Sequence, residues 1–272
     1  MATASLIDPA IDLLNLDLPA EDGEPLESAW HRAEINLLID SLYNHWRGRS
    51  DFYAGGNMFI YYSLEQVRRG NFLGPDFFVV LGVDGAPLRE SWVVWNEGGR
   101  YPDLIVELAS PTTALADRTT KKDLYEQIFR MPEYFLYDPA TQELTGWRRS
   151  NGKYGRPSPK TQGRLWSKKL GLWLGLWHGV YLGQDTTWLR FYTEEGDLVL
   201  TGTEAEARQA AVEARRADAE AKRADSEAKR AAVEAQRAEE QAQRAEQAEA
   251  EIERLRAQLR AAGIDPNAPP GR

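Results

Sequence analysis

Alanine recurs at alternating steps of four and three residues along the last quarter of the chain. The series runs through residues 210, 214, 217, 221, 224, 228, 231, 235, 238, 242 and 245. A spacing of 3.5 residues over about five heptads is that of a left-handed coiled-coil seam. Acidic residues precede basic ones by three positions, which supports a helix: Glu213, Glu220, Glu227 and Glu234 stand before Arg216, Arg223, Arg230 and Arg237. The pattern predicts one long helix over residues 204–262.

The partner of this helix is open from the sequence. Either a second copy of the chain or another helix could pair along residues 210–260, whereas the high helix propensity of Ala, Glu, Lys and Arg would also sustain a solitary, solvated helix. The seam changes phase near Ala248, where Ile252, Leu255 and Leu259 take over. Alanine buries little apolar area, so most of the pairing strength is expected in that last part.

The rest of the chain has the composition of a globular domain. All nine Trp lie in the first 190 residues, and the hydrophobic share of 42% is sufficient for a sizeable core. We expect a flexible segment over residues 1–25, a domain over residues 26–203, the helix over residues 204–262 and a disordered tail over residues 263–272.

Composition excludes several classes of protein. The chain has no Cys, so disulfides, thiolate metal sites and a cysteine nucleophile are excluded. The first twenty residues have no Lys or Arg, and the longest apolar stretch, residues 170–183, is shorter than the roughly 20 residues that a spanning helix needs. A cytoplasmic protein without a membrane anchor is the expectation.

The domain is acidic. The net charge is -9, and residues 204–272 hold 13 basic and 15 acidic side chains, which leaves -7 for the remainder. Such a surface holds polyanions poorly by charge alone, which weighs against a general DNA-binding module.

Hydrophobic patterning predicts an α/β domain. Apolar residues at helical spacing predict a helix from Ser28 to Trp46, and a second helix is expected over residues 113–130. Strands are expected at MFIYYS, FFVVLGV, SWVVW, LIVELAS and EYFLYD, and shorter ones beyond residue 144 include a hairpin through Glu195 and Gly196. The expected fold is a mixed sheet flanked by helices, with extra C-terminal β-hairpins.

Two acidic residues stand where burial is costly. Glu107 interrupts the run LIVELA, and Asp76 begins FFVVL. A buried carboxylate needs a hydrogen bond, an ion pair or a metal. Lys121 shares a helical stripe with apolar residues and should face the sheet, whereas Lys122 points away. These groups suit a divalent cation such as Mg²⁺, with the lysine orienting or deprotonating a water, but a structural ion pair of Glu107 and Lys121 fits the spacing equally well.

Several segments together resemble a known family. GPDFFVVLGV, SWVVWNEGGRYPDLIVELASPTT and ADRTTKKDLYEQIFRMPEYFLYDP are similar to the Uma-two family, restriction-endonuclease-like proteins of the PD-(D/E)XK phosphodiesterase superfamily, of the cyanobacterial type. The resemblance covers about residues 28–200. It implies a restriction-endonuclease-like fold, with Asp76 and Glu107 as Mg²⁺ ligands and the Leu108 carbonyl as a candidate third.

The lysine departs from the standard superfamily motif. Its usual place, two residues after the acid, is taken by Ala109, and the Uma-two pattern maps the catalytic lysine to Lys121 instead. Lys122 is a further candidate, and Glu34 is a weaker one for the acid that many superfamily members carry on the first helix. Asp103 and His31 are expected to be a turn residue and an ordinary helix residue.

Two functions follow as hypotheses. The first is an endonuclease that uses Mg²⁺, or Mn²⁺ as its substitute, to hydrolyse DNA through Asp76, Glu107 and Lys121, with the long helix joining two copies. The second is a catalytically inactive adaptor with a nuclease fold that assembles partners through its coiled coil.

Overall fold

The computed structural model describes residues 18–19, 28–71, 73–111, 113–159 and 163–263. The flexible segment expected over residues 1–25 and the disordered tail expected over residues 263–272 therefore lie almost wholly outside the described residues. The chain divides into two compact units, Met1–Ala205 and Glu206–Arg272. None of the described helices is long and apolar enough to cross a membrane.

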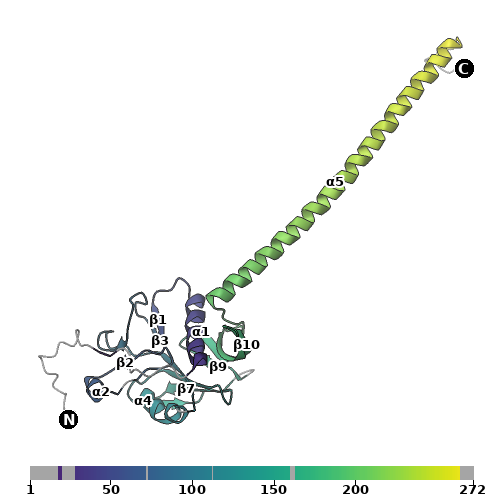
Figure 1. The fold of residues 1–272 in the computed structure, drawn as a ribbon. Helices are drawn as coiled ribbons and strands as arrows, with labels where there is room; N and C mark the ends of the chain where they lie inside the picture. Colours follow the sequence, from purple (N-terminus) through teal and green to yellow (C-terminus); the bar gives the residue numbers. More distant parts are fainter. Residues whose placement is uncertain (1–17, 20–27, 72, 112, 160–162, 264–272) are drawn as a thin grey trace. The chain divides into compact units, whose positions relative to one another are not determined.

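The first unit is built on a six-stranded mixed sheet (Figure 1). Its strands stand in the order β1 (Phe52–Gly55), β3 (Phe77–Leu81), β5 (Leu104–Leu108), β6 (Glu133–Asp138), β7 (Glu143–Ser150) and β8 (Lys153–Gly155). Only β5 and β6 pair in parallel; the other neighbours are antiparallel. The connection from β5 to β6 carries α3 (Ala114–Ala116), a π-helical turn η1 (Asp117–Lys121) and α4 (Lys122–Gln127).

The central strands are apolar on both faces because both faces are covered. Alternate residues of β3, β5 and β6 contribute to two separate hydrophobic clusters. One cluster includes α1 (Ala29–His45) and the three-stranded sheet of β9 (Leu165–Ser167), β10 (Leu172–Tyr181) and β11 (Gln184–Tyr192). The other includes residues of α4, and Figure 1 shows α1 and α4 on opposite sides of the sheet.

The expected fold is confirmed, with corrections in detail. The predicted SWVVW strand is only β4 (Trp92–Val93), which pairs with β2 (Ile60–Tyr61) outside the main sheet. Strand β1 and the short helix α2 (Leu64–Arg69) were not predicted. The chain reverses through Glu195 and Gly196 as predicted, but the second arm is no full strand. Strand β11 ends at Tyr192, one antiparallel bridge joins Tyr192 to Leu198, and the N–H of Val199 donates to the Phe191 carbonyl (3.0 Å).

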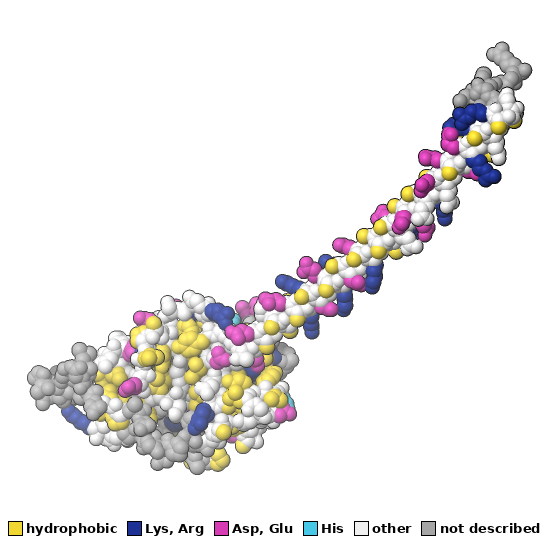
Figure 2. Space-filling view, turned by 45° about the horizontal axis from the view of Figure 1, so that its top comes forward, with side chains coloured by type: hydrophobic (Ala, Val, Ile, Leu, Met, Phe, Trp, Pro, Cys, Tyr) yellow, Lys and Arg dark blue, Asp and Glu magenta, His cyan; other side chains and the backbone are white. Residues whose placement is uncertain are grey.

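The long C-terminal helix is also confirmed. Helix α5 (Gly202–Ala261) is 60 residues long and has no buried residue. Ion pairs four residues apart support it, such as Asp218 with Lys222 (2.7 Å) and Asp225 with Lys229 (2.6 Å). Figure 2 shows hydrophobic side chains in a line along the helix. Its pairing as a coiled coil stays a prediction.

Candidate active site

Asp76 and Glu107 lie side by side on neighbouring strands. Asp76 directly precedes β3, and the antiparallel register sets Phe77 opposite Val106 of β5. The carboxylate of Asp76 therefore reaches the end of β5, where its Oδ2 accepts a hydrogen bond from the backbone N–H of Leu108 (2.7 Å). By the alternation of a strand, both acidic side chains lie on the face that α4 covers.

The carboxylate of Glu107 is buried and has a partner on each oxygen. The Tyr125 hydroxyl donates to Oε1 (2.6 Å), and the Lys121 Nζ lies 3.2 Å from Oε2. Only 1% of the Glu107 surface is exposed, and this burial raises its pKa to about 7 despite the nearby Lys121. Burial likewise raises the pKa of Asp76 to about 6. Two adjacent carboxyl groups thus titrate near neutral pH, where a cation would favour their ionised forms.

Lys121 is held by two acids. Its Nζ lies 2.8 Å from Oδ1 of Asp117 as well as 3.2 Å from Glu107, and both acids are 1% exposed. Burial lowers the pKa of Lys121, but the carboxylates of Glu107 and Asp117 outweigh that effect and raise it overall. Lys121 is therefore an ammonium at neutral pH, which can orient a water or stabilise negative charge but cannot deprotonate a water.

The alternative lysine lies elsewhere. Lys122 pairs with Asp123 (3.3 Å) and Glu126 (3.4 Å), on the side of α4 that the sequence predicted to be exposed. Of the two candidate lysines, Lys121 is the one that the structure brings to Glu107.

Two other acids named from the sequence have partners away from this cluster. Glu34 of α1 is fully buried against β11, where its Oε2 accepts the backbone N–H of Leu189 (3.0 Å). Asp103 binds the N–H of Leu81 through Oδ2 (2.9 Å) and pairs with Lys169 (2.7 Å).

Sequence reasoning assigned no role to two residues of the cluster, or to a third that contacts the Leu108 carbonyl. Asp117 and Tyr125 stand four residues before and after Lys121, and this spacing was the available signal. His31 was expected to be an ordinary helix residue, yet its Nε2 lies 3.1 Å from the Leu108 carbonyl oxygen. Nothing in the local sequence of His31 indicates this contact, since it joins residues 77 positions apart.

The donor atoms suit a hard divalent cation. Among the described residues, no group of three or more His, Cys, Asp and Glu side chains is arranged to hold a metal ion. Mg²⁺, however, is commonly held by one or two carboxylates, with waters and substrate phosphates completing its shell. Asp76, Glu107 and the Leu108 carbonyl are all oxygen donors. Burial raises the pKa of the two acids, to about 6 and about 7, so a bound cation would offset the cost of ionising them. These residues fit such an ion.

Comparison with known proteins identifies the family. No curated protein matches the chain. Among solved structures, the chain is similar to the crystal structure of "a putative nuclease belonging to DUF820" from Anabaena variabilis, with 14% sequence identity and a TM-score of 0.40 over 58% of this chain and 87% of that one. The Uma2 family model, described as "Putative restriction endonuclease", matches residues 21–182. Since this match spans more than half of the 272 residues, the chain belongs to the Uma2 family of restriction-endonuclease-like proteins, as the resemblance implied.

Proposed function

We propose that this protein is a divalent-metal-dependent endodeoxyribonuclease whose active site is formed by Asp76, Glu107 and Lys121. The observation that carries the proposal is the buried contact of Glu107 with both Lys121 and Tyr125, beside the carboxylate of Asp76. Isolated buried charges are costly, so a cluster of two titratable acids and a lysine at the end of a strand supports the assignment of an active site here.

Each residue has a distinct role in this proposal. Asp76, Glu107 and the Leu108 carbonyl would hold Mg²⁺, with Mn²⁺ as its substitute, and the ion would supply Lewis-acid activation of a water and of the phosphodiester. Lys121, as an ammonium, orients the water and stabilises the charge that develops on the phosphate.

Two further residues position this set. Asp117 fixes the Lys121 side chain through the 2.8 Å contact. The Tyr125 hydroxyl fixes the rotamer of Glu107 through Oε1, leaving lone pairs of both acids for a cation.

The second candidate function is the inactive adaptor. The same contacts also favour this function: Lys121 already pairs with both Glu107 and Asp117, so the cluster could be a structural ion-paired group that needs no metal. The exposed helix α5, along which a second copy or a partner helix could pair, would then be the functional part of the chain.

One experiment separates the two functions. Mg²⁺ and Mn²⁺ are titrated calorimetrically into the wild type and into Glu107→Gln, and plasmid and single-stranded DNA are tested for cleavage. Asp103→Asn is the matched control, because Asp103 is also an acid at a strand but binds Lys169. The nuclease is supported if Glu107→Gln alone loses metal binding and cleavage. If the wild type binds neither metal and cuts neither DNA, the nuclease proposal fails and the adaptor remains as the candidate function.

A further inference from the structure

We infer that the pocket beside Lys121 binds an unpaired nucleotide base, so that the substrate is single-stranded or locally unpaired DNA. The inference rests on the proposed function, because it places the phosphate at the Lys121 cluster and asks where the adjoining nucleotide lies.

The pocket adjoins the cluster directly. It has a volume of about 790 Å³ and is lined by residues before, within and after α2 on one side and by η1 and α4 on the other. Lys121 is part of this lining and also contacts Glu107 at 3.2 Å. A strand with its phosphate at Lys121 can therefore extend into the pocket without crossing the core.

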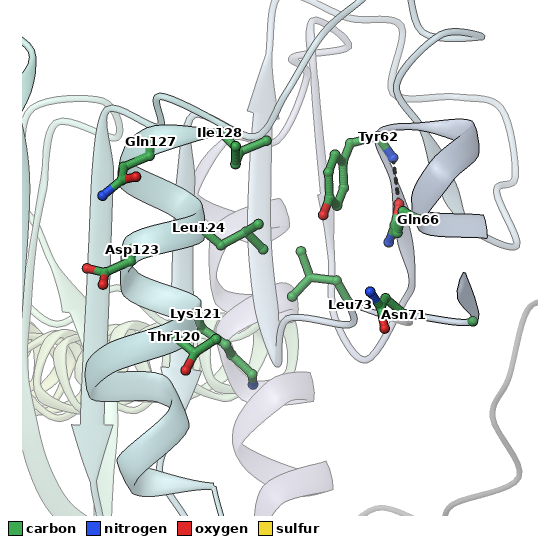
Figure 3. A pocket seen from close by; sticks show the side chains of 11 residues that line it. Tyr62, Gln66, Asn71, Leu73, Thr120, Lys121, Asp123, Leu124, Gln127 and Ile128 are labelled. Atoms are coloured by element: carbon green, nitrogen blue, oxygen red, sulfur yellow. Dashed lines mark hydrogen bonds between the residues drawn. The ribbon is translucent and has the colours of Figure 1, made fainter. Parts of the chain in front are cut away.

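The two walls have the character of a slot for a flat ring. Figure 3 shows Tyr62 and Leu73 on one wall facing Leu124 and Ile128 on the other, with Lys121 and Thr120 at one end. Ile128 is 52% exposed, so its apolar side chain is available for contact with a ligand. Proteins hold unpaired bases between aromatic and apolar side chains in this way, whereas a paired base has its faces covered by its neighbours.

Volume and charge both disfavour a duplex here. A volume of about 790 Å³ lies in the range of small-ligand pockets, roughly 300–1,000 Å³, which can admit unpaired nucleotides but not a duplex. Among the described residues, Lys121 and Asp123 are the only charged side chains that line it, and their formal charges are opposite. Both duplexes and single strands are bound in part by neutralising backbone phosphates, but only an unpaired base can also stack on the pocket walls, so a pocket with little net charge favours the single strand.

The test measures binding apart from cleavage. Fluorescence anisotropy is recorded with a fluorescein-labelled single-stranded oligonucleotide and with the same strand in a duplex, in the presence of a metal chelator. Ile128 is the position to vary because its exposure lets the fold tolerate change. Ile128→Asp removes an apolar side chain from the pocket wall and adds a negative charge that repels the DNA phosphates. Ile128→Phe enlarges the surface on which a base can stack. Leu182→Asp, at a 69% exposed site in the β10–β11 turn, is the control.

We expect the single strand to bind at least about tenfold more tightly than the duplex, with about tenfold weakening in Ile128→Asp, tighter binding in Ile128→Phe and no change in Leu182→Asp. Equal or tighter binding of the duplex, or unchanged binding in both Ile128 variants, would overturn the inference. Cleavage by the wild type with Mg²⁺ is then assayed separately. If the binding pattern is found but no DNA is cut with any divalent metal, the pocket stands as a site for unpaired DNA and the proposed catalysis fails.

Discussion

Lys121 lies closer to Asp117 than to Glu107, at 2.8 Å against 3.2 Å. The lysine is therefore anchored on its own helical segment by one acid and presented to the sheet toward the other. An ammonium that contacts Glu107 must also compete with any cation that binds the same carboxylate.

This competition separates the role of the lysine from that of the metal ligands. In Lys121→Met we expect cleavage to fall by about 10²–10³, because a preorganised charge at the phosphate is lost. The affinity for Mg²⁺ should rise or stay unchanged, because the competing ammonium is gone. Lys122→Met, one residue along and paired with Asp123 and Glu126, is the control and should keep both properties. Calorimetry and a cleavage assay give the two readouts, and a parallel loss of both in Lys121→Met would contradict the assignment.

Glu34 gives the pH dependence of stability a definite sign. Burial raises the pKa of Glu34 from 4.5 to about 8, so between these values the unfolded chain is ionised at Glu34 while the folded chain keeps the proton. The folded state then binds more protons, and the free energy of unfolding must fall as pH rises through this window, on the order of 5 kcal/mol for this group. Glu34→Gln should flatten that fall and make the variant more stable than the wild type at pH values above about 8. Urea unfolding of the wild type and of Glu34→Gln at acidic and alkaline pH measures this change in the free energy of unfolding.

The matched control for Glu34 is Glu90→Gln, since Glu90 is exposed. Asp76 and Glu107 also have raised pKa values, so only the difference between variant and wild type reports on Glu34. If the two stability curves stay parallel across the pH range, Glu34 is not protonated in the folded protein.

Glu204 is expected to be a large contributor to stability. Arg190 is fully buried and donates to Glu204 through Nη1 (3.0 Å) and Nη2 (2.6 Å), while the same carboxylate caps α5 by accepting the N–H of Thr201 (2.8 Å). Glu204→Ala leaves a buried guanidinium without its counter-charge, so unfolding free energy should drop by about 3–5 kcal/mol. Tryptophan fluorescence reports on the first unit alone, because every Trp precedes residue 190. Glu206→Ala, at an exposed site of the same helix, should leave the denaturant midpoint unchanged.

The charges beside the alanine seam favour a partner other than a second copy. With alanine at the a and d positions of α5, the g positions hold Glu213, Glu220, Glu227 and Glu234, and the e positions include Asp218, Asp225, Glu239 and Glu246. Two copies would face acid with acid in either orientation. We expect no pairing of the wild type at neutral pH, but pairing in a variant in which those four g-position Glu are changed to Lys, because its g positions then face acidic e positions of the second copy. Sedimentation velocity of each chain tests this, and a stable wild-type dimer would refute it.

Sequence patterns predicted the parts of the fold that depend on local chemistry. Continuous apolar runs identified β3, β5 and β6, and an acid within such a run identified Glu107. Strand β1 was missed because its four residues, FYAG, form no run or alternation of their own and exist only by pairing with β3.

Contacts between distant segments could not be predicted in the same way. The proximity of Asp76 to Leu108 depends on the register of β3 against β5, and that of His31 to the Leu108 carbonyl depends on how α1 packs across the sheet. Neither contact follows from spacing along the chain. The sequence could therefore identify Asp76 as a candidate site residue but could not show which groups its carboxylate contacts.

The π-helical turn η1, which ends at Lys121, contains one residue more than a regular helical turn would need. Hydrogen bonds of such a turn span five residues instead of four, so it accommodates one residue more than a regular helix; π-turns are rare and are frequently found at functional sites. A chain shortened by one residue between Arg118 and Thr120 could continue α3 into α4 as an unbroken α-helix, but Lys121 would rotate by about 100° and leave Glu107. An unbroken α-helix from α3 to α4 and the contact of Lys121 with Glu107 therefore exclude each other. A lineage that no longer used the cluster would be free to lose the extra residue.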